Sequence, residues 1–252
     1  MTKIILQITK IIITIVSLIL FSSCAFINDG DGNGYSYRNV KGNGNVITEK
    51  RNVKNGFNYV SGGSGLEITI EQGSETSITV EADENLQKHI ITEVKGRELV
   101  IYTDVNLKKA SAKKIMIRMP EIKGISSSSS ASITTKKSIK ATTLNLSSSS
   151  GSEMNVTINA DNVTCDASSG AALLVYGNTR DLMTESSSGG TVNAKGLTAE
   201  NVKADASSGG STIVNPKQSL KAEASSGGSI KYINTPKNIS KESSSGGSIY
   251  KG

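Results

Sequence analysis

Apolar and polar residues alternate one for one over many short stretches of this chain. The clearest stretches between residues 60 and 120 are 66–70, 77–81, 98–102 and 114–119. A period of two residues is typical of a β-strand that buries one face. Residues 85–91 are the only part of this region in which we expect a short helical segment. The pattern therefore predicts an all-β fold.

The second half of the chain repeats the phrase Ser-Ser-Gly. Its glycines are separated by 19, 19, 20, 18 and 19 residues, and a degenerate copy, Ser128–Ala131, lies about one period upstream. The glycines are Gly151, Gly170, Gly189, Gly209, Gly227 and Gly246. A fixed period indicates stacked repeats, and a strand–helix–strand unit would need about 30 residues. We predict a parallel β-helix, a β-solenoid, of about 19 residues per coil and six or seven coils.

The repeated serines favour a structural role. We expect their hydroxyls to face inward at one corner of the coil and to bond from coil to coil as a ladder. The predicted ladder consists of Ser150, Ser169, Ser188, Ser208, Ser226 and Ser245. A catalytic serine is the alternative, but a Ser-His-Asp triad would have to use His89, the only histidine. A single histidine also argues against a zinc site.

One acidic residue precedes each of the last five glycines by four positions. These acids are Asp166, Glu185, Asp205, Glu223 and Glu242. Stacked strands would place them on the outer surface about 5 Å apart, where like charges oppose one another. Lys203 and Lys221 lie two residues before two of the acids and would balance them. A calcium site is the first alternative, and a glycosidase-like carboxylate pair is the second.

Residues 1–23 have the features of a signal peptide. Lys3 and Lys10 are basic, residues 11–21 are almost entirely apolar, and two serines precede Cys24. The apolar run is shorter than the ~20 residues that span a bilayer. Residues 21–24 resemble a lipobox, although Phe21 stands where leucine is usual. We therefore predict lipidation of Cys24 and a lipid anchor in the membrane; an ordinary signal peptide or an uncleaved anchor are the alternatives.

The next two segments connect this signal to the repeats. Residues 24–48 are rich in Gly, Asn and Asp and predict a flexible tether. Residues 29–34 match the opening of a calcium loop, but Val40 occupies the twelfth position, where the bidentate Glu should be. Residues 49–120 predict an N-terminal β region that caps the solenoid, with residues 60–63 as a candidate early coil. The repeat region itself covers residues 121–252.

The charge and the cysteine content of the chain exclude some classes of function. Removal of residues 1–23 leaves 26 basic and 22 acidic residues, a net charge of +4. The lysines are scattered and tryptophan is absent, so we expect no nucleic-acid binding. With Cys24 lipidated, Cys165 has no intramolecular partner. It aligns with small residues in other repeats, which predicts a buried, inert thiol.

Several short runs resemble one bacterial family. They are Gly56–Gly62, Ile68–Gly73, Val80–Leu86 and Gly96–Leu99, in this order. With the Ser-Ser-Gly coils, residues 40–250 are similar to the head GIN domain family, whose members are classed as auto-transporter adhesins. The resemblance implies an extracytoplasmic β-helical protein, as is common in Bacteroidetes-like bacteria. It offers no catalytic residues to carry over.

Two functions remain open at this point. The first is a non-enzymatic lipoprotein at the outer membrane or cell surface, an adhesin or binding module that presents a repetitive face to a surface glycan or protein. The second is a polysaccharide lyase or hydrolase on the same scaffold, since a fold does not determine an activity. A groove with non-repeating side chains would favour the enzyme. The last coil, with residues 243–252, predicts a strand edge for homo-oligomer formation.

Overall fold

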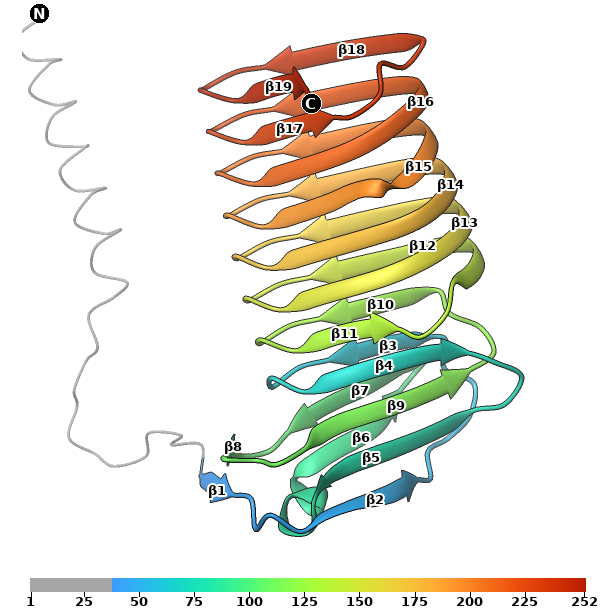
Figure 1. Cartoon of the computed structure of the whole chain (residues 1–252), viewed down its shortest axis with the longest axis vertical. Coiled ribbons are helices and arrows are strands. Elements are labelled where there is room, and N and C mark those ends of the chain that lie inside the picture. Colours follow the sequence, from blue (N-terminus) through green and yellow to red (C-terminus); the bar gives the residue numbers. More distant parts are fainter. Residues whose placement is uncertain (1–37) are drawn as a thin grey trace, which may run out of the picture. The chain divides into compact units, whose positions relative to one another are not determined.

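Four long strands form the centre of the structure, and each of them makes up most of one coil of a β-solenoid (Figure 1). The computed structural model describes residues 38–252. The four strands are β13 (Glu153–Ala167), β14 (Ala172–Ser186), β15 (Thr191–Ala206) and β16 (Ser211–Ala224). Each pairs in parallel with the next, so residues at the same position in successive coils lie side by side. With about seven turns and about 19 residues per coil, the solenoid confirms the predicted fold class.

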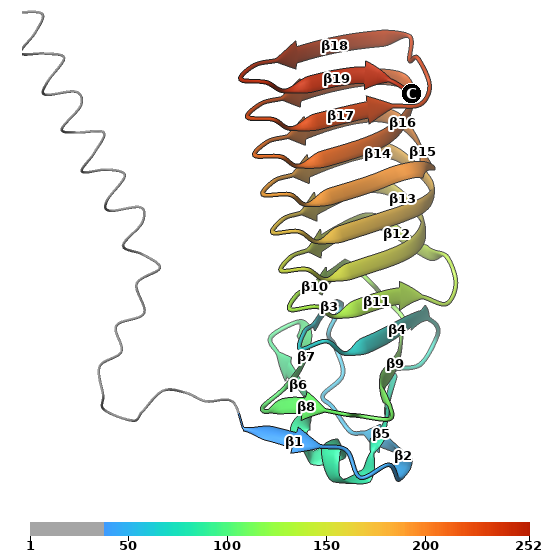
Figure 2. The ribbon, with the colours of Figure 1, turned by 60° about the vertical axis from the view of Figure 1, so that its left-hand side comes forward.

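Each coil bends near its middle, so the solenoid has two layers with the apolar core between them (Figures 1 and 2). Residues that face inward are stacked in columns. One such column contains Leu146, Cys165, Thr184, Ala204 and Ala222. All five are fully buried. Cys165 is a free cysteine, and burial raises the pKa of its thiol far above the ordinary range.

The Ser-Ser-Gly phrases form tight turns at one edge of the coils. In the turn after β13, Ser169 has φ 52° and Gly170 has φ 71°. The N–H of Ala171 donates to the carbonyl of Ser168 at 3.1 Å, which closes the turn. Two successive positive φ angles define a type I′ turn. Glycine adopts this conformation without a steric penalty, which explains its place at the end of every phrase.

The coil that follows the degenerate phrase is longer than the others. Thr134 pairs with Asn155, an offset of 21 residues, whereas Ile139 pairs with Ile158, an offset of 19. Two extra residues therefore lie between Thr134 and Ile139, where the strand is interrupted. The strands of this region are β10 (Gly124–Ser127), β11 (Ser132–Thr135) and β12 (Ile139–Ser148). The interruption separates β11 from β12, which are one continuous strand in the next coil.

Parallel stacking continues below β10 and β11, so residues 60–63 do belong to an early coil. There β3 (Tyr59–Gly62) pairs with β10, and β4 (Glu67–Gln72) pairs with β11. Their other edges pair in parallel with β7 (Glu98–Thr103) and β9 (Lys113–Met119).

Antiparallel pairs complete the N-terminal end of the solenoid. The strands β2 (Val46–Arg51) and β5 (Ser77–Asp83) pair with each other, β5 pairs with β9, and β6 (Ile90–Lys95) pairs with β7. A 3₁₀ helix, η1 (Glu84–His89), lies at the predicted helical segment. We call residues 38–123 the cap.

The folded region begins earlier than the sequence pattern predicted. A short strand, β1 (Asn39–Lys41), pairs with β8 (Asn106–Lys108), and β2 begins at Val46. The predicted end of the tether at residue 48 is therefore wrong. The signal peptide and Cys24 lie outside the described residues. None of the helices within residues 38–252 is long and apolar enough to span a bilayer.

Two carboxylates with many partners hold the cap together. The Asp83 side chain is fully buried and accepts hydrogen bonds from the backbone N–H groups of Gly44 and Ser111, both at 2.7 Å. Burial opposes its charged form, but these bonds outweigh that effect and keep the pKa of Asp83 below its ordinary value.

Glu71, 4% exposed, contacts Lys137 at 3.0 Å and Arg118 at 3.1 Å. These two cations lower the pKa of Glu71 to about 2.

The final coil consists of β17 (Ser229–Tyr232), β18 (Asn238–Ser243) and β19 (Ser248–Lys251). The inward positions of β18 are less covered than those of earlier coils. Ile239 is 41% exposed, whereas Leu220, its neighbour in the preceding coil, is 2% exposed. Lys241 occupies the column that holds Ala222 one coil earlier, and its Nζ lies 5.4 Å from the centre of the Tyr232 ring.

Candidate functional site

The most regular surface of the molecule is the outward side of the second half of each coil, which we call the ladder face. Its residues come from β12 to β16 and β18, and parallel pairing places them in columns along the solenoid axis. The predicted acids form one of these columns, since each pairs with the next in the adjacent strand. The column reads Asp166, Glu185, Asp205, Glu223 and Glu242. Serines occupy this position in earlier coils, so the charge begins at β13.

A groove follows the last four acids. It has a volume of about 480 Å³ and is lined by these acids and by the first serine of each adjoining turn. Lys203 Nζ lies 3.2 Å from Asp205, and Lys221 Nζ lies 2.8 Å from Glu223. The Lys221 contact lowers the pKa of Glu223 and raises that of Lys221. Both predicted lysine partners therefore contact the acids to which they were assigned.

The N-terminal end of the acid column has no such partners. Thr164 and Met183 occupy the positions that Lys203 and Lys221 hold in later coils. Burial raises the pKa of Asp166, and the charge of Glu185 adds to the effect. Within residues 38–252 no three His, Cys, Asp or Glu side chains lie close enough together to hold a metal ion. The column therefore offers no assembled calcium site.

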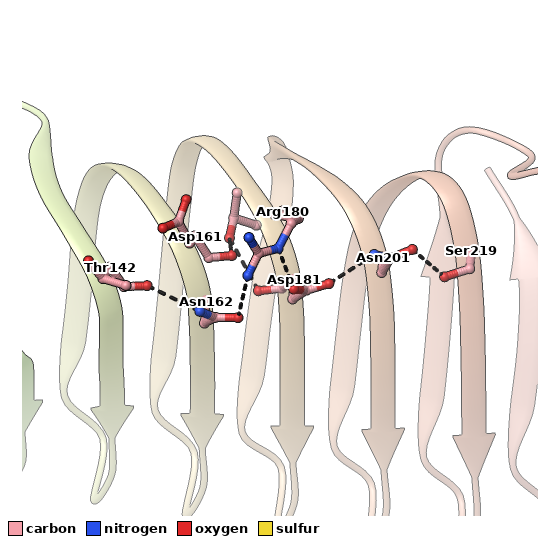
Figure 3. Close-up of polar contacts among 8 residues, drawn as sticks. Thr142, Asp161, Asn162, Arg180, Asp181, Asn201 and Ser219 are labelled. Atoms are coloured by element: carbon pink, nitrogen blue, oxygen red, sulfur yellow. Dashed lines mark hydrogen bonds and ion pairs between the residues drawn. The ribbon is translucent and has the colours of Figure 1, made fainter.

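A second column on this face is a chain of polar side chains (Figure 3). Asn201 Nδ2 donates to Asp181 Oδ1 at 2.9 Å, and Ser219 Oγ donates to Asn201 Oδ1 at 2.8 Å. Arg180 donates to Asp181 Oδ2 at 2.8 Å and to Asn162 Oδ1 at 3.4 Å. Asn162 in turn donates to the carbonyl of Thr142 at 3.4 Å. The bonds from Arg180 and then Asn201 lower the pKa of Asp181, so its charge is retained.

This polar column borders a hollow of about 420 Å³. Val163, Leu182 and Val202 line its floor together with the polar groups. Because the amides and the carboxylate bond mainly to one another, they hold a fixed spacing from coil to coil. The ladder face thus presents ordered hydrogen-bonding groups along an extended line rather than around one point.

The predicted serine ladder needs correction. The residues in question are Ser150, Ser169, Ser188, Ser208, Ser226 and Ser245. All six have positive φ and exposed side chains, so the prediction that their hydroxyls face inward is wrong. Their backbones do connect the coils, because the N–H of Gly170 donates to the carbonyl of Ser188 at 3.2 Å, and the other turns repeat this bond.

Buried hydroxyls lie elsewhere in the turns. Ser127, Ser148 and Ser152 form a cluster in which the Ser127 and Ser148 oxygens are 2.8 Å apart and each is 3.0 Å from Ser152 Oγ. The position of Ser148 is occupied by Ala167, Ser186, Ala206 and Ala224 in later coils, so the buried hydroxyls do not follow the repeat.

His89 does not contribute to a serine-based catalytic site. The residue is 7% exposed, and its Nδ1 lies 2.8 Å from Asp104 Oδ1. Both residues belong to the cap, at the end of η1 and just after β7. The repeated serines lie at the turns of the solenoid, so the structure shows no Ser-His pair among the described residues.

The comparison with known families decides the classification. A family model described as "Putative auto-transporter adhesin, head GIN domain" matches residues 56–236. The chain belongs to the head GIN domain family. The match includes most of the cap and all but the last repeat, and is shorter than residues 40–250, for which the sequence resemblance was predicted. Among proteins with curated functions, none matches this head GIN chain.

Solved structures share the fold. A "putative adhesin" from Bacteroides fragilis has a TM-score of 0.77 at 20% identity, covering 84% of this chain and 99% of that one. A "putative adhesin" from Parabacteroides distasonis has a TM-score of 0.69 at 19% identity, covering 85% and 100%. A "putative lipid binding protein" from the same species has a TM-score of 0.66 at 22% identity, with the same coverage. None of these three is described as an enzyme.

Proposed function

We propose that this protein is a lipid-anchored binding module of the cell envelope, and that the ladder face contacts a surface glycan or protein. The observation that carries the proposal is the register of the outward columns over successive coils. Such a surface presents the same chemistry many times and suits an extended ligand better than a small reactant. The adhesin description of the family supports the same reading.

Two observations support binding rather than catalysis. Lys203 and Lys221 neutralise Asp205 and Glu223, and the groups of the other polar column bond mainly to one another. A glycosidase needs a protonated acid and a free carboxylate flanking one bond. The acid column instead repeats carboxylates over five successive coils, from Asp166 to Glu242.

The anchoring part of the proposal has a matched control in the chain. Cys24→Ser should abolish incorporation of labelled palmitate and release the protein from the membrane fraction. Cys165→Ser removes the only other cysteine and should leave labelling unchanged. Palmitate incorporation into the Cys24→Ser protein would contradict the proposed anchor.

The binding part is tested with the purified full chain on a glycan array and a panel of envelope proteins. Captured polysaccharides are then incubated with the protein and assayed for new reducing ends and unsaturated products. We expect capture without cleavage. Release of such products would contradict the proposed binding function and favour a polysaccharide-active enzyme.

A further inference from the structure

One hollow of the molecule is built from residues that do not repeat. It has a volume of about 430 Å³ and lies where the cap meets the first regular coil. Its walls come from Tyr59 of β3, from residues 121–123 before β10, and from residues 140–143 and Asn145 of β12. It therefore adjoins the coil that carries the two extra residues. Thr142, at the start of the polar column in Figure 3, is also part of its wall.

An aromatic ring forms one side of this hollow. Tyr59 pairs with Gly124 of the adjacent coil, and a Cβ on Gly124 would lie only 2.5 Å from the Tyr59 ring. The ring thus covers the outward side of the glycine, and the residue is still 36% exposed. Glycine permits this close approach, and the contact fixes the ring while leaving part of it open to solvent. Exposed rings held in this way are suited to packing against the C–H face of a pyranose.

The charges around the hollow favour an anion. Glu121 already has partners, since Lys123 lies 3.1 Å away and Asn58 donates to it at 2.9 Å. The hydrogen bond from Asn58, followed by that from Lys123, lowers the pKa of Glu121. The Glu121 carboxylate therefore stays charged, and it is already bonded to Asn58 and Lys123. Lys140 forms no ion pair with a carboxylate of residues 38–252. One cation of the wall is therefore free to bind an acidic group.

The backbone beside this lysine is held in place. Gln72 of β4 accepts from the N–H of Lys140 at 2.8 Å and donates to its carbonyl at 3.0 Å. Asn145, Thr142 and Thr143 add amide and hydroxyl groups to the wall. An aromatic ring, a few polar groups and a cation in one concave site are the usual elements of a ligand pocket.

We propose that this hollow binds one acidic sugar residue of a polysaccharide, with the pyranose ring on Tyr59 and its carboxylate or sulfate on Lys140. The inference rests on the proposed function as a binding module and names its ligand class. The polar column that starts at Thr142 gives the rest of the chain a path along the ladder face. The acid column follows the same face from β13 onward and disfavours anions there, so the hollow is where this face accommodates an acidic group.

The test measures binding of tetragalacturonate to the purified full chain by calorimetry, with its methyl-esterified form as a neutral ligand of the same shape. A sulfated tetrasaccharide and inorganic sulfate extend the comparison. We expect the acidic tetramers to bind more tightly than the ester or sulfate alone, and their affinity to fall with added salt. Equal binding of the acid and its ester, or no binding of any acidic tetramer, would overturn the proposal.

Variants locate the site. Tyr59→Ala should raise the Kd about tenfold or more, because it removes the ring, whereas Tyr59→Phe should stay within about twofold. Lys140→Gln should raise the Kd about fivefold and abolish the preference for the acid over the ester. Tyr176 is the matched control, since it covers Gly196 in the same way, is 37% exposed and lies outside the hollow.

The outcomes separate this inference from the function on which it rests. If acidic tetramers bind but Tyr59→Ala and Lys140→Gln have no more effect than Tyr176→Ala, the hollow is not the site, and binding elsewhere on the ladder face still stands. If the array and the protein panel show no ligand of any kind, the proposed function itself fails.

Discussion

The solenoid and the cap satisfy their polar groups in different ways. In the coils from β12 onward, backbone groups pair with the adjacent coils, and side-chain contacts are small and repeated. In the cap, single side chains such as Asp83 and Glu71 each join segments distant in sequence. The stability of the coils therefore depends on a backbone path that is the same in each coil, whereas the stability of the cap depends on particular ionised side chains. Substitutions of backbone-determining glycines should mainly destabilise the coils, and substitutions of these ionised residues should mainly destabilise the cap.

The largest effect is expected where two coil backbones come closest. Gly177 in β14 has φ 116°, and a Cβ there would lie 1.9 Å from the carbonyl oxygen of Ile158. Gly177→Ala should destabilise the protein by about 3–5 kcal/mol, because both the conformation and the contact are unfavourable. Hydrogen exchange should show faster opening of β13 to β15, with the cap less affected. Gly189→Ala is the control, since φ is also positive there but no atom lies within 4 Å.

In the cap, the most sensitive side chain should be Asp83. Asp83→Asn replaces one accepting oxygen by a donor that faces backbone N–H groups, so bonds from Gly44 or Ser111 are lost. We expect a loss of about 2–4 kcal/mol in the free energy of unfolding, measured by urea denaturation. Asp161→Asn, an exposed position in the solenoid, should change it by less than about 0.5 kcal/mol. An equally large loss of stability in Asp161→Asn would contradict the expected difference between the cap and the solenoid.

Acid should weaken the cap before the coils. Glu71 and Asp83 have lowered pKa values in the folded state, so their stabilisation is present above the unfolded pKa and is lost as the pH falls. For Glu71 the loss extends from about pH 4.5 to about pH 2. In the solenoid, Asp181 and Glu223 also have lowered pKa values, but their side chains are both 42% exposed, so their protonation should cost less. Asp166 has a raised pKa, so its protonation removes an unfavourable charge. Hydrogen exchange at pH 3 and pH 6 should show cap strands losing protection first; loss in the coils first would contradict this.

The smallest effect separates the two kinds of serine. Ser148→Ala removes a buried hydroxyl from the cluster with Ser127 and Ser152 and should cost about 1–2 kcal/mol. Ser150→Ala removes an exposed hydroxyl two residues away and should cost less than about 0.5 kcal/mol. Thermal denaturation of both proteins measures the difference. Equal losses of stability in the two variants would mean that the hydroxyl of Ser150 also has a structural role.

Sequence reasoning located the acid column because a constant period fixes the position of a residue in its coil. Parallel pairing in register then makes Asp205 and Glu223 neighbours without any further information. The same reasoning was wrong about the inward serines. Inward-facing serines would require the alternation of faces to continue past Ala224 to Ser226, but Ser226 lies in the turn, where two residues with positive φ interrupt it.

Two other features could not be obtained from the pattern. Alternation shows that residues 46–51 and 77–83 are strands, but it does not show that they pair with each other in antiparallel fashion. The longer coil after Ser128 resembled one more period, so its two extra residues were not recognised. The hollow beside Tyr59 includes residues of that coil, and Gly124 became informative only when the Tyr59 ring was seen to cover it.

The in-register stacking also bears on how such proteins diverge. Each coil adds one row to every outward column, and rows in neighbouring strands are about 4.8 Å apart. Duplication or deletion of one whole repeat would therefore lengthen or shorten the ladder face in fixed steps while preserving its chemistry. In this architecture the length of the ladder face changes with the number of repeats, whereas its chemistry changes by substitution within a column. The two can therefore change independently.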